Sequence, residues 1–548
     1  MLSHYIEILE SKNEWIENLI NTLSIEEKIA QLLILPVWTD KGEAHLTEIE
    51  QILAQHEVGG ILFVTGTPHK QVEVTNRLQQ KAQIPFLVAL DAEWGLAMRL
   101  KNSIKYPYQL ALGGMPDGQG IYAMAAEIAK QLKRIGVHLN FSPCADVNTL
   151  PQNPVISYRS FGENAHVVSN YSAIYMKALH DNGIVAVAKH FPGHGATDKD
   201  SHYTLPDVFL NKEQFEATDL YPFKELINQG LVSIMTAHIY VPALDNSAKQ
   251  ASSISTKIVS DLLKHELNFK GLIITDAMDM KGVSECYPAG EADFRALLAG
   301  NDMLEMVHDV NLCVQTVKQK IETKQFDLTQ LDSKLRKVLA LKYLLGLNQK
   351  PKLIETNNLD EDLNTSHALE VNYFLRKRIV CMLRNENGNL PINKQLKTVV
   401  VSLSSDKITK FQETIAAETT ASLLFLSPKA NENEINELKK QIATFQQKII
   451  AVHNLSVFYT DKFGLTPQLE SLLSYFINSE NCTIVLFANP YILEYIPNIE
   501  KSKALLISME GLRTPSEEEN YFSQEIVAQI VLGHEKAVAK LPFKSSVF

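Results

Sequence analysis

The sequence predicts an α/β protein with two domains, a (β/α)8 TIM barrel followed by a smaller α/β sandwich domain. Eight short apolar runs alternate with amphipathic helical stretches up to residue 306. Polar residues stand where most of these runs end, and a second set of alternating runs begins at residue 398. The length of 548 residues also exceeds what one hydrophobic core usually supports.

The eight runs of the first region are read as the strands of the barrel. Strands of a parallel barrel are buried on both faces, so each is expected as a continuous apolar segment. The runs lie at 31–38, 58–65, 84–91, 137–147, 184–190, 231–238, 272–276 and 302–306. An open doubly wound sheet is the alternative, but the glycine-rich dinucleotide loop of that fold is absent from the sequence.

A Leu/Lys-rich helical pattern at 328–347, followed by Asn-Gln-Lys-Pro, indicates the end of the barrel. We therefore predict a barrel domain at residues 1–350, a linker at 351–395 and a sandwich domain at 396–548. The second set of runs predicts a mostly parallel sheet, with a helix at 432–446. These runs lie at 398–403, 421–427, 448–453, 482–487 and 504–509.

The composition is that of an ordinary globular protein, with 45% hydrophobic and 21% charged residues. A formal net charge of -11 argues against nucleic acid or an anionic membrane as a partner, since both favour a basic surface. No apolar run reaches the roughly 18 residues of a transmembrane helix. Five cysteines without a CxxC pair argue against a disulfide framework or a structural zinc site.

Residues 1–30 carry charges throughout and lack the basic start, apolar run and cleavage site of a secretory signal. The expected location is cytoplasmic, or periplasmic or secreted if a leader was removed before residue 1. The sequence makes no prediction of the oligomeric state.

Polar residues recur where the barrel runs end. They are Asp91, Asp146, Lys189, His190, His238 and Asp276. One such residue alone is usually a turn or a cap. In a barrel, however, the carboxyl ends of all strands open on one face, where active sites assemble. We therefore predict an active site on this face.

The loop after the fifth run carries Lys-His-Phe-Pro-Gly-His-Gly at 189–195 and then the triplet Asp200-Ser201-His202. The Pro-Gly break ends the strand and begins a flexible segment. In the triplet, the Asp200 carboxylate can accept a hydrogen bond from one ring nitrogen of His202, which fixes the tautomer and raises the basicity of the other nitrogen. We therefore predict that His202 is a general acid/base oriented by Asp200.

Asp276 ends a fully apolar strand. A buried carboxylate is costly unless it is paired or hydrogen-bonded, so this residue needs a partner or a function. As a helix N-cap it would have its partner. As a nucleophile with a separate proton donor, it would make the arrangement of a retaining glycosidase, which forms and then hydrolyses a covalent glycosyl-enzyme. Asp279 is expected inside the following helix.

The histidines of this loop allow two alternatives. The first follows from a histidine that stands in place of the usual second carboxylate. Neutral imidazole does not repel an anion in the second step, so phosphate could compete with water as the acceptor. Alternatively, His190, His194 and His202 could bind a metal ion together with Asp200. The helical spacing of a zinc hydrolase motif such as His-Glu-x-x-His is absent, so we predict neither a metal nor a cofactor.

These motifs also occur in an order that is known from one family. The sequence resembles glycoside hydrolase family 3, specifically its β-N-acetylglucosaminidase (β-N-acetylhexosaminidase) branch, from residue 23 to about residue 345. The resemblance rests on the segments 23–32, 91–99, 153–162 and 189–202 and on the Asp276 strand. One departure is Ala-Glu-Trp-Gly at 92–95, where the family more often has Gln-Glu-Gly-Gly. Its Trp94 either stacks on a sugar or fills the top of the barrel.

The resemblance implies a retaining exo-β-N-acetylglucosaminidase that hydrolyses terminal β-linked N-acetylglucosamine, as in peptidoglycan recycling or the breakdown of chitin-type fragments. It implies that Asp276 is the nucleophile and that His202, positioned by Asp200, is the proton donor. The residues that it implies for holding the sugar are Asp91, Arg99, Arg159, Lys189 and His190.

Two other functions remain open at this stage. A β-glucosidase or β-xylosidase of the same family would ordinarily recruit a carboxylate from the second domain as its proton donor, and the His202 loop argues against that. A catalytically silent barrel that binds glycans is the alternative from a different class. The intact set of Asp200, His202 and Asp276 argues against it.

Overall fold

The computed structural model describes residues 1–514, 517 and 519–548, and the chain forms two compact units. The first unit comprises residues 1–106, 121–160 and 164–369. The second comprises residues 107–120, 161–163 and 370–548, so it takes in two short segments from within the predicted barrel range. Among the described residues, no helix is long and apolar enough to cross a membrane.

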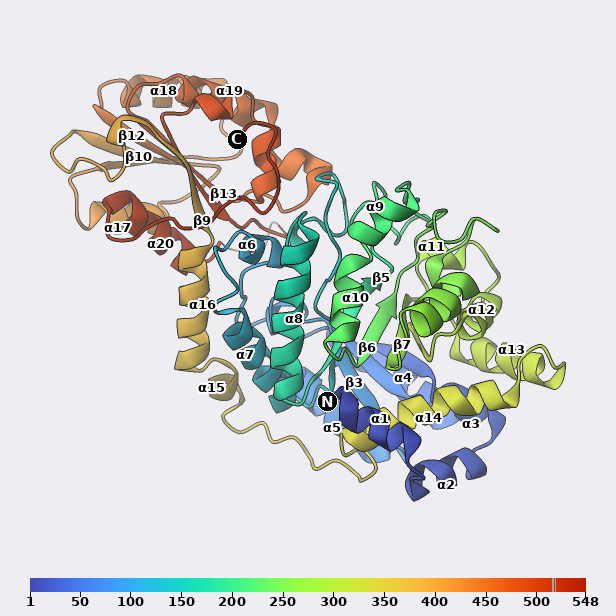
Figure 1. Ribbon diagram of the computed structural model, residues 1–548. Coiled ribbons are helices and arrows are strands. Elements are labelled where there is room, and N and C mark those ends of the chain that lie inside the picture. The colour runs from blue at the N-terminus through green and yellow to red at the C-terminus, as the bar shows by residue number, and fades with distance from the viewer. Residues whose placement is uncertain (515–516, 518) are drawn as a thin grey trace. The chain divides into compact units, whose positions relative to one another are not determined.

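The first unit contains a closed barrel of eight parallel strands in sequence order, which confirms the predicted TIM barrel (Figure 1). The strands are β1 (Leu33–Trp38), β2 (Gly60–Thr65), β3 (Leu87–Leu90), β4 (Leu139–Asn140), β5 (Val185–Phe191), β6 (Ser233–Thr236), β7 (Leu272–Ala277) and β8 (Met303–Glu305). Each lies within or beside a predicted run. The fourth is much shorter than predicted because the Ser142 N–H donates to the Asn140 carbonyl of its own chain, and pairing with β5 resumes only as a bridge between Cys144 and Lys189.

Helices surround these strands, as Figure 1 shows. They are α1 (Leu2–Glu10), α2 (Glu14–Thr22), α3 (Ile25–Ala30), α4 (Glu43–Gln55), α5 (Pro68–Lys81), α7 (Ile121–Arg134), α8 (Ala165–Asp181), α9 (Lys212–Ala217), α10 (Tyr221–Asn228), α11 (Lys281–Ser284), α12 (Glu291–Ala299), α13 (Val310–Glu322), α14 (Leu328–Leu344) and α15 (Leu359–Leu363). Local chemistry sets several boundaries. At α3, for example, Ser24 and Glu27 form a reciprocal capping box that satisfies backbone donors of the first turn.

The second unit is built on a six-stranded sheet in the order β11-β10-β12-β13-β14-β9. Its strands are β9 (Val380–Asn385), β10 (Thr398–Leu403), β11 (Ser422–Leu426), β12 (Gln447–Val452), β13 (Cys482–Ala488) and β14 (Ala504–Met509). All neighbours are parallel except β9, which runs antiparallel to β14. The sheet is therefore mostly parallel, as predicted.

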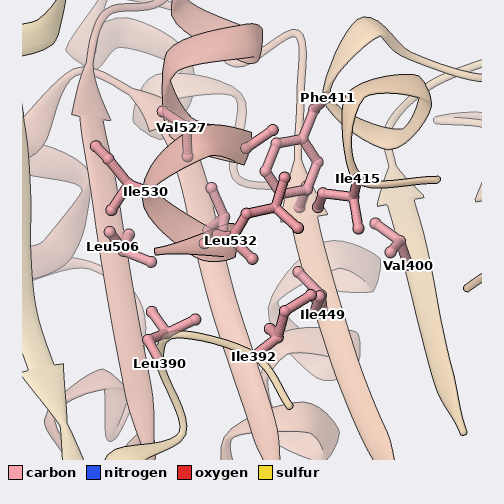
Figure 2. Close-up of a cluster of buried hydrophobic side chains, with 14 of the residues drawn as sticks. Leu390, Ile392, Val400, Phe411, Ile415, Ile449, Leu506, Val527, Ile530 and Leu532 are labelled. Carbon is pink, nitrogen blue, oxygen red and sulfur yellow. The ribbon is translucent and has the colours of Figure 1, made fainter. Parts of the chain in front are cut away.

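Helices cover both faces of this sheet, with α18 and α19 on one side and α17 and α20 on the other (Figure 1). The helices of the second unit include α6 (Gln109–Gly113), α17 (Lys410–Ala416), α18 (Glu432–Ile442), α19 (Pro467–Ile477) and α20 (Tyr521–Leu532), while α16 (Ser366–Arg378) begins in the first unit. Figure 2 shows the core between the sheet and α17 and α20, where Phe411, Val527 and Ile530 meet strand residues such as Val400 and Leu506. This burial of apolar side chains stabilises the unit.

The strand β9 was not among the predicted strands and lies inside the range predicted as a linker. It pairs on one side only, and four of its six residues are partly or largely exposed. An edge strand of this kind does not need a continuous apolar run, so its sequence carries little strand signal.

Candidate active site

The carboxyl ends of the barrel strands bring the predicted site residues together. Asp91 follows β3, Lys189 and His190 lie near the end of β5, and Asp276 lies near the end of β7. Two further predicted residues come from short 3-10 turns, with Arg99 directly after Leu96–Met98 and Arg159 at the end of Ser157–Arg159. We refer to this face as the rim.

Five charged side chains form one ion cluster on the rim. Lys189 Nζ donates to Asp91 Oδ1 at 2.6 Å and lies 2.9 Å from Glu93 Oε1. Arg99 Nε donates to the other Asp91 oxygen at 3.1 Å. Arg159 donates to Glu93 through Nη2 at 2.7 Å and through Nε at 3.1 Å. The cluster thus contains four predicted site residues and Glu93, whose role the sequence did not indicate.

Electrostatics keep both carboxylates of this cluster ionised. Burial opposes the charge of Asp91, but Arg99 and Lys189 outweigh it and hold the pKa of Asp91 far below its ordinary value. Burial likewise opposes the charge of Glu93, yet Arg159 and Lys189 lower its pKa to about 2. The side chains are therefore held as fixed donors and acceptors, which suits the recognition of polar hydroxyl groups.

A buried Asp146 joins His190 to this cluster. His190 Nδ1 donates to Asp146 at 2.7 Å, and Arg159 Nη2 lies 3.3 Å from His190 Nε2. Because an arginine can only donate, Nε2 acts as the acceptor and Nδ1 carries the proton. The backbone N–H of His194 also donates to Asp146 at 2.7 Å. Asp146 thereby fixes the tautomer and orientation of His190.

Asp276 is half-buried, and its Oδ1 accepts a hydrogen bond from the backbone N–H of Ala277 at 2.9 Å. Burial raises its pKa, but His190, His238 and that N–H group lower it more, so the net shift is downward. Asp276 is not a helix cap, because the N-cap of α11 is Met280. Asp279 lies in the turn before this helix, so the prediction that it is helical is wrong.

His238 supports the same strand end. Its Nε2–H donates to the Ala277 carbonyl at 3.0 Å, and its Nδ1 lies 2.7 Å from Ser253 Oγ. The backbone beside Asp276 is therefore held from two directions, by the strand ladder and by this imidazole. The sequence marked His238 as a strand-end residue without indicating this role.

Asp200 and His202 form the predicted pair on the loop after β5. His202 Nδ1 donates to Asp200 Oδ1 at 2.7 Å, and the His202 backbone N–H donates to the same oxygen at 2.8 Å. This hydrogen bond raises the pKa of His202; burial lowers it and the negative charge of Asp276 raises it further. The His202 side chain is 59% exposed, so the ring is accessible.

Buried contacts hold the loop that carries this pair. Gly195 packs directly on the chain, since a Cβ there would lie 1.7 Å from the Val147 carbonyl oxygen. His194 lies 2.8 Å from Thr197 Oγ1 through Nδ1 and 3.0 Å from Ser201 Oγ through Nε2. Both of its nitrogens are therefore engaged by the protein, in contrast to the alternative in which His194 binds a metal ion.

Trp94 and one group of potential metal ligands complete the description of the rim. Trp94 is 1% exposed and packs 5.8 Å from the Tyr158 ring, so it fills the barrel top and presents no face to a sugar. The ligand atoms of Cys144, Asp146 and His190 lie within 4.8 Å of one another. Burial and Asp146 raise the pKa of the Cys144 thiol well above its usual range, which favours an S–H donor to Asp146 at 3.2 Å.

A barrel whose rim holds an ion cluster, a half-buried aspartate and an exposed Asp–His pair defines a hydrolase-type site for a polar substrate. The model of the glycosyl hydrolase family 3 N-terminal domain matches residues 24–341. The chain therefore belongs to glycosyl hydrolase family 3, a family of enzymes that act on the glycosidic bonds of carbohydrates.

Named relatives of the chain include several β-hexosaminidases. It is 34% identical to β-hexosaminidase A of Pseudoalteromonas piscicida over 385 residues, which cover 64% of this chain and 63% of that protein. It is 28% identical to β-hexosaminidase LpqI of Mycobacterium tuberculosis over 335 residues, which cover 58% of this chain and 83% of the relative. The match thus spans slightly less than two thirds of the Pseudoalteromonas protein.

Solved structures share the whole architecture. A glycoside hydrolase family 3 β-N-acetylglucosaminidase from Paenibacillus sp. str. FPU-7 aligns with a TM-score of 0.80 at 23% identity, covering 96% of this chain and all of that one. The β-glucoside phosphorylase BglX aligns with a TM-score of 0.83 at 18% identity, covering 99% of both chains. At these identities the likeness establishes the fold alone.

Proposed function

We propose that the protein is a retaining exo-β-N-acetylglucosaminidase that hydrolyses terminal β-linked N-acetylglucosamine from peptidoglycan or chitin-type fragments. The observation that carries this proposal is the hydrogen-bonded pair of Asp200 and His202 on a loop beside Asp276. This arrangement supplies a nucleophile and a separate proton donor, which retaining glycosidases require.

In the first step, the Asp276 carboxylate attacks the anomeric carbon and the glycosidic bond breaks. Protonated His202 donates its Nε2 proton to the leaving oxygen while its Nδ1–H remains hydrogen-bonded to Asp200. In the second step, neutral His202 takes a proton from water as the water oxygen attacks the anomeric carbon of the glycosyl-enzyme. Asp276 is released and His202 is protonated again, so the cycle is balanced.

The ion cluster supports the proposal because it supplies groups that can bind the sugar. Asp91 can accept hydrogen bonds from hydroxyls of the terminal sugar, while Arg99, Arg159 and Lys189 can donate to hydroxyl oxygens and to the acetamido carbonyl. The five side chains of the cluster, which also includes Glu93, and His190 hold one another in place before the substrate arrives. Little ordering entropy is therefore lost on binding. Carboxylates that bind a non-reducing-end hydroxyl also favour exo cleavage.

The relatives support the acetamido sugar as the substrate. The proteins named above from Pseudoalteromonas and Mycobacterium are called β-hexosaminidases, and a 24% identical Cellulomonas fimi relative is called a β-N-acetylglucosaminidase/β-glucosidase. A glucoside is therefore the necessary comparison substrate.

The test is hydrolysis of an aryl β-N-acetylglucosaminide beside the matching aryl β-glucoside, followed by proton NMR. We expect release of the aryl alcohol from the acetamido sugar, with the β-anomer of the free sugar formed first. Release of the α-anomer first would contradict a retaining mechanism. Cleavage of the glucoside alone would favour a β-glucosidase, and inertness toward both would favour a silent glycan-binding barrel.

The same assay with added inorganic phosphate tests the acceptor in the second step. We expect free sugar as the product at all phosphate concentrations. A sugar 1-phosphate would show that phosphate replaces water at the glycosyl-enzyme.

A further inference from the structure

Glu305 is a carboxyl group on the rim that the proposed mechanism does not use. It is the last residue of β8 and is 5% exposed. Its backbone is fixed, because its N–H donates to Thr275 Oγ1 at 3.1 Å and its carbonyl accepts from Met278 N–H at 2.8 Å. The side chain therefore projects from a rigid strand end that is paired with β7 and β1.

The Oε2 atom of Glu305 is buried and has no hydrogen-bond partner among the described residues. A buried polar atom of this kind costs free energy unless something pairs with it, so it calls for an explanation. The negative charges of Asp276 and Asp91 act on the Glu305 carboxyl group, and the positive charges of Lys189 and Arg99 act on it less strongly. These are the proposed nucleophile and three members of the ion cluster, and Glu305 is in register with Ala277, the neighbour of Asp276, so its carboxyl group lies beside the proposed sugar site.

The pKa of Glu305 also shifts in the opposite direction from those of Asp91 and Glu93. Burial raises the pKa of Glu305 well above its usual range, and the negative charges of Asp276 and Asp91 raise it further. This upward shift favours the neutral acid, which has one O–H donor and one carbonyl acceptor. Asp91 can only accept and Lys189 can only donate, whereas Glu305 can do both toward one hydroxyl group.

We propose that Glu305 is a further substrate-binding residue, whose carboxyl group pairs with a hydroxyl of the terminal sugar held between Asp91 and Asp276. The inference rests on the proposed function and adds a specificity determinant to it. Because the carboxyl group is already desolvated, a sugar that lacks this hydroxyl would leave it unpaired, and such sites discriminate strongly against deoxy analogues.

The opposite end of the same strand offers a matched control. Asp302 directly precedes β8 and is also buried, but Lys337 Nζ donates to it at 3.0 Å and the Ile273 N–H at 2.9 Å. Lys264 Nζ lies 3.8 Å from its other oxygen, so Asp302 is a structural carboxylate surrounded by donors. Removing its charge should lower stability without changing substrate recognition.

The experiment compares wild type with Glu305→Met, Glu305→Gln and Asp302→Asn on an aryl β-N-acetylglucosaminide and its 3-, 4- and 6-deoxy analogues. We expect Glu305→Met to lower kcat/KM about 10- to 100-fold and Glu305→Gln, which keeps a donor and an acceptor, to lower it less than about fivefold. One deoxy substrate should be cleaved equally well by wild type and Glu305→Met, which identifies the hydroxyl.

Thermal melting separates a binding role from a structural role. Glu305→Met should melt at the wild-type temperature or higher, because it removes an unpaired buried polar group, while Asp302→Asn should melt lower and keep the wild-type preference among substrates. Unchanged kcat/KM in Glu305→Met would overturn the inference while leaving the proposed function intact. Equal losses on every deoxy analogue with a lowered melting temperature would also overturn it. An inert wild type would overturn the proposed function itself.

Discussion

Two regions of the molecule hold a histidine paired with a carboxylate, and they differ in what surrounds the pair. On the barrel rim, His202 Nδ1 lies 2.7 Å from Asp200, and the side chain is 59% exposed. In the sandwich unit, His453 Nδ1 lies 2.6 Å from Glu519, and the His453 side chain is 1% exposed. The pairs are alike in bond length, so bond length does not identify a catalytic pair.

The sandwich pair lies in a cavity of about 980 Å³ that opens at the carboxyl ends of β10, β11 and β12. The strand order changes direction between β10 and β12, which is where open α/β sheets usually bind ligands. Yet His453 Nε2 lies 3.3 Å from Ser402 Oγ, and the ring stacks 4.8 Å from Phe487. Glu519 also accepts from Gln524 at 3.0 Å.

The rim differs because its polar groups are incompletely paired. Asp276 is only half-buried, the His202 ring is accessible and Glu305 has an oxygen without a partner among the described residues. In the cavity of the sandwich unit, His453 and Glu519 both have further hydrogen-bonding partners within the protein. Spare hydrogen-bonding capacity at buried or half-buried groups, rather than cavity volume, therefore distinguishes the proposed active site from the sandwich cavity.

The largest expected effect comes from exchanging one carboxylate in each region. Asp276→Asn should lower kcat on the aryl N-acetylglucosaminide at least about 10³-fold because it removes the proposed nucleophile. Glu519→Gln should change kcat less than about threefold and lower stability by about 1–2 kcal/mol, since it leaves a buried histidine poorly paired. Initial rates and urea unfolding measure the two effects. A large loss of kcat in Glu519→Gln would contradict the assignment of the chemistry to the rim and would support a proton donor in the second domain.

The two histidines give the next largest contrast. His202→Ala should lower kcat about 10²–10³-fold at unchanged melting temperature, because the ring is an exposed acid/base. His453→Ala should instead lower the stability by about 2 kcal/mol, because it removes a buried, hydrogen-bonded and stacked ring. The exposed His265, which lies 3.8 Å from Asp261, supplies a matched control, and His265→Ala should change neither quantity. Equal losses of activity in all three variants would contradict the assignment of His202.

A smaller effect is expected in the pH profile of kcat/KM. His202 must be protonated to act as the acid, and its hydrogen bond to Asp200 raises its pKa. Removing that carboxylate lowers the pKa, so His202 loses its proton at a lower pH. Asp200→Ala should therefore shift the alkaline limb toward lower pH and leave the acid limb, set by Asp276, nearly in place. An unmoved alkaline limb would remove the basis for treating the two residues as a pair.

The smallest effect on catalysis is expected at Trp94. Its burial against Tyr158 predicts that Trp94→Phe lowers stability by about 1–2 kcal/mol through lost packing and changes KM less than about twofold. Urea unfolding and steady-state kinetics measure both quantities. A large rise in KM at unchanged stability would instead show that the ring binds sugar.

Much of the barrel was predictable because its strands are buried on both faces and leave continuous apolar runs in the sequence. The edge strand β9 escaped prediction because it is paired on one side and partly exposed. Within the site, Asp276 was recognisable as a charge that ends an apolar strand. Asp200 and His202 were recognisable because they are two residues apart, and such a spacing allows a hydrogen bond within one loop.

The sequence did not show how other residues of the rim pair with one another. Glu93 and Asp146 act through Arg159, Lys189 and His190, which approach them from distant parts of the chain. Glu305 stands near the end of an apolar run, as Asp276 does, but a sequence does not show which carboxylate has hydrogen-bonding partners. Only the surroundings decide whether the pKa of such a carboxyl group is raised, as for Glu305, or lowered, as for Asp91.

The sequence by itself determined the fold class, the order of the strands and the family, because periodicity and local motifs are properties of neighbouring residues. It also determined which residue types stand at the strand ends. Only the tertiary structure decided which of these groups pair, which remain unpaired and which are exposed. The physical reason is that hydrogen bonds, burial and pKa shifts at the rim arise between residues far apart in the chain, such as Asp91 and Lys189, whose contact exists only once the barrel has closed.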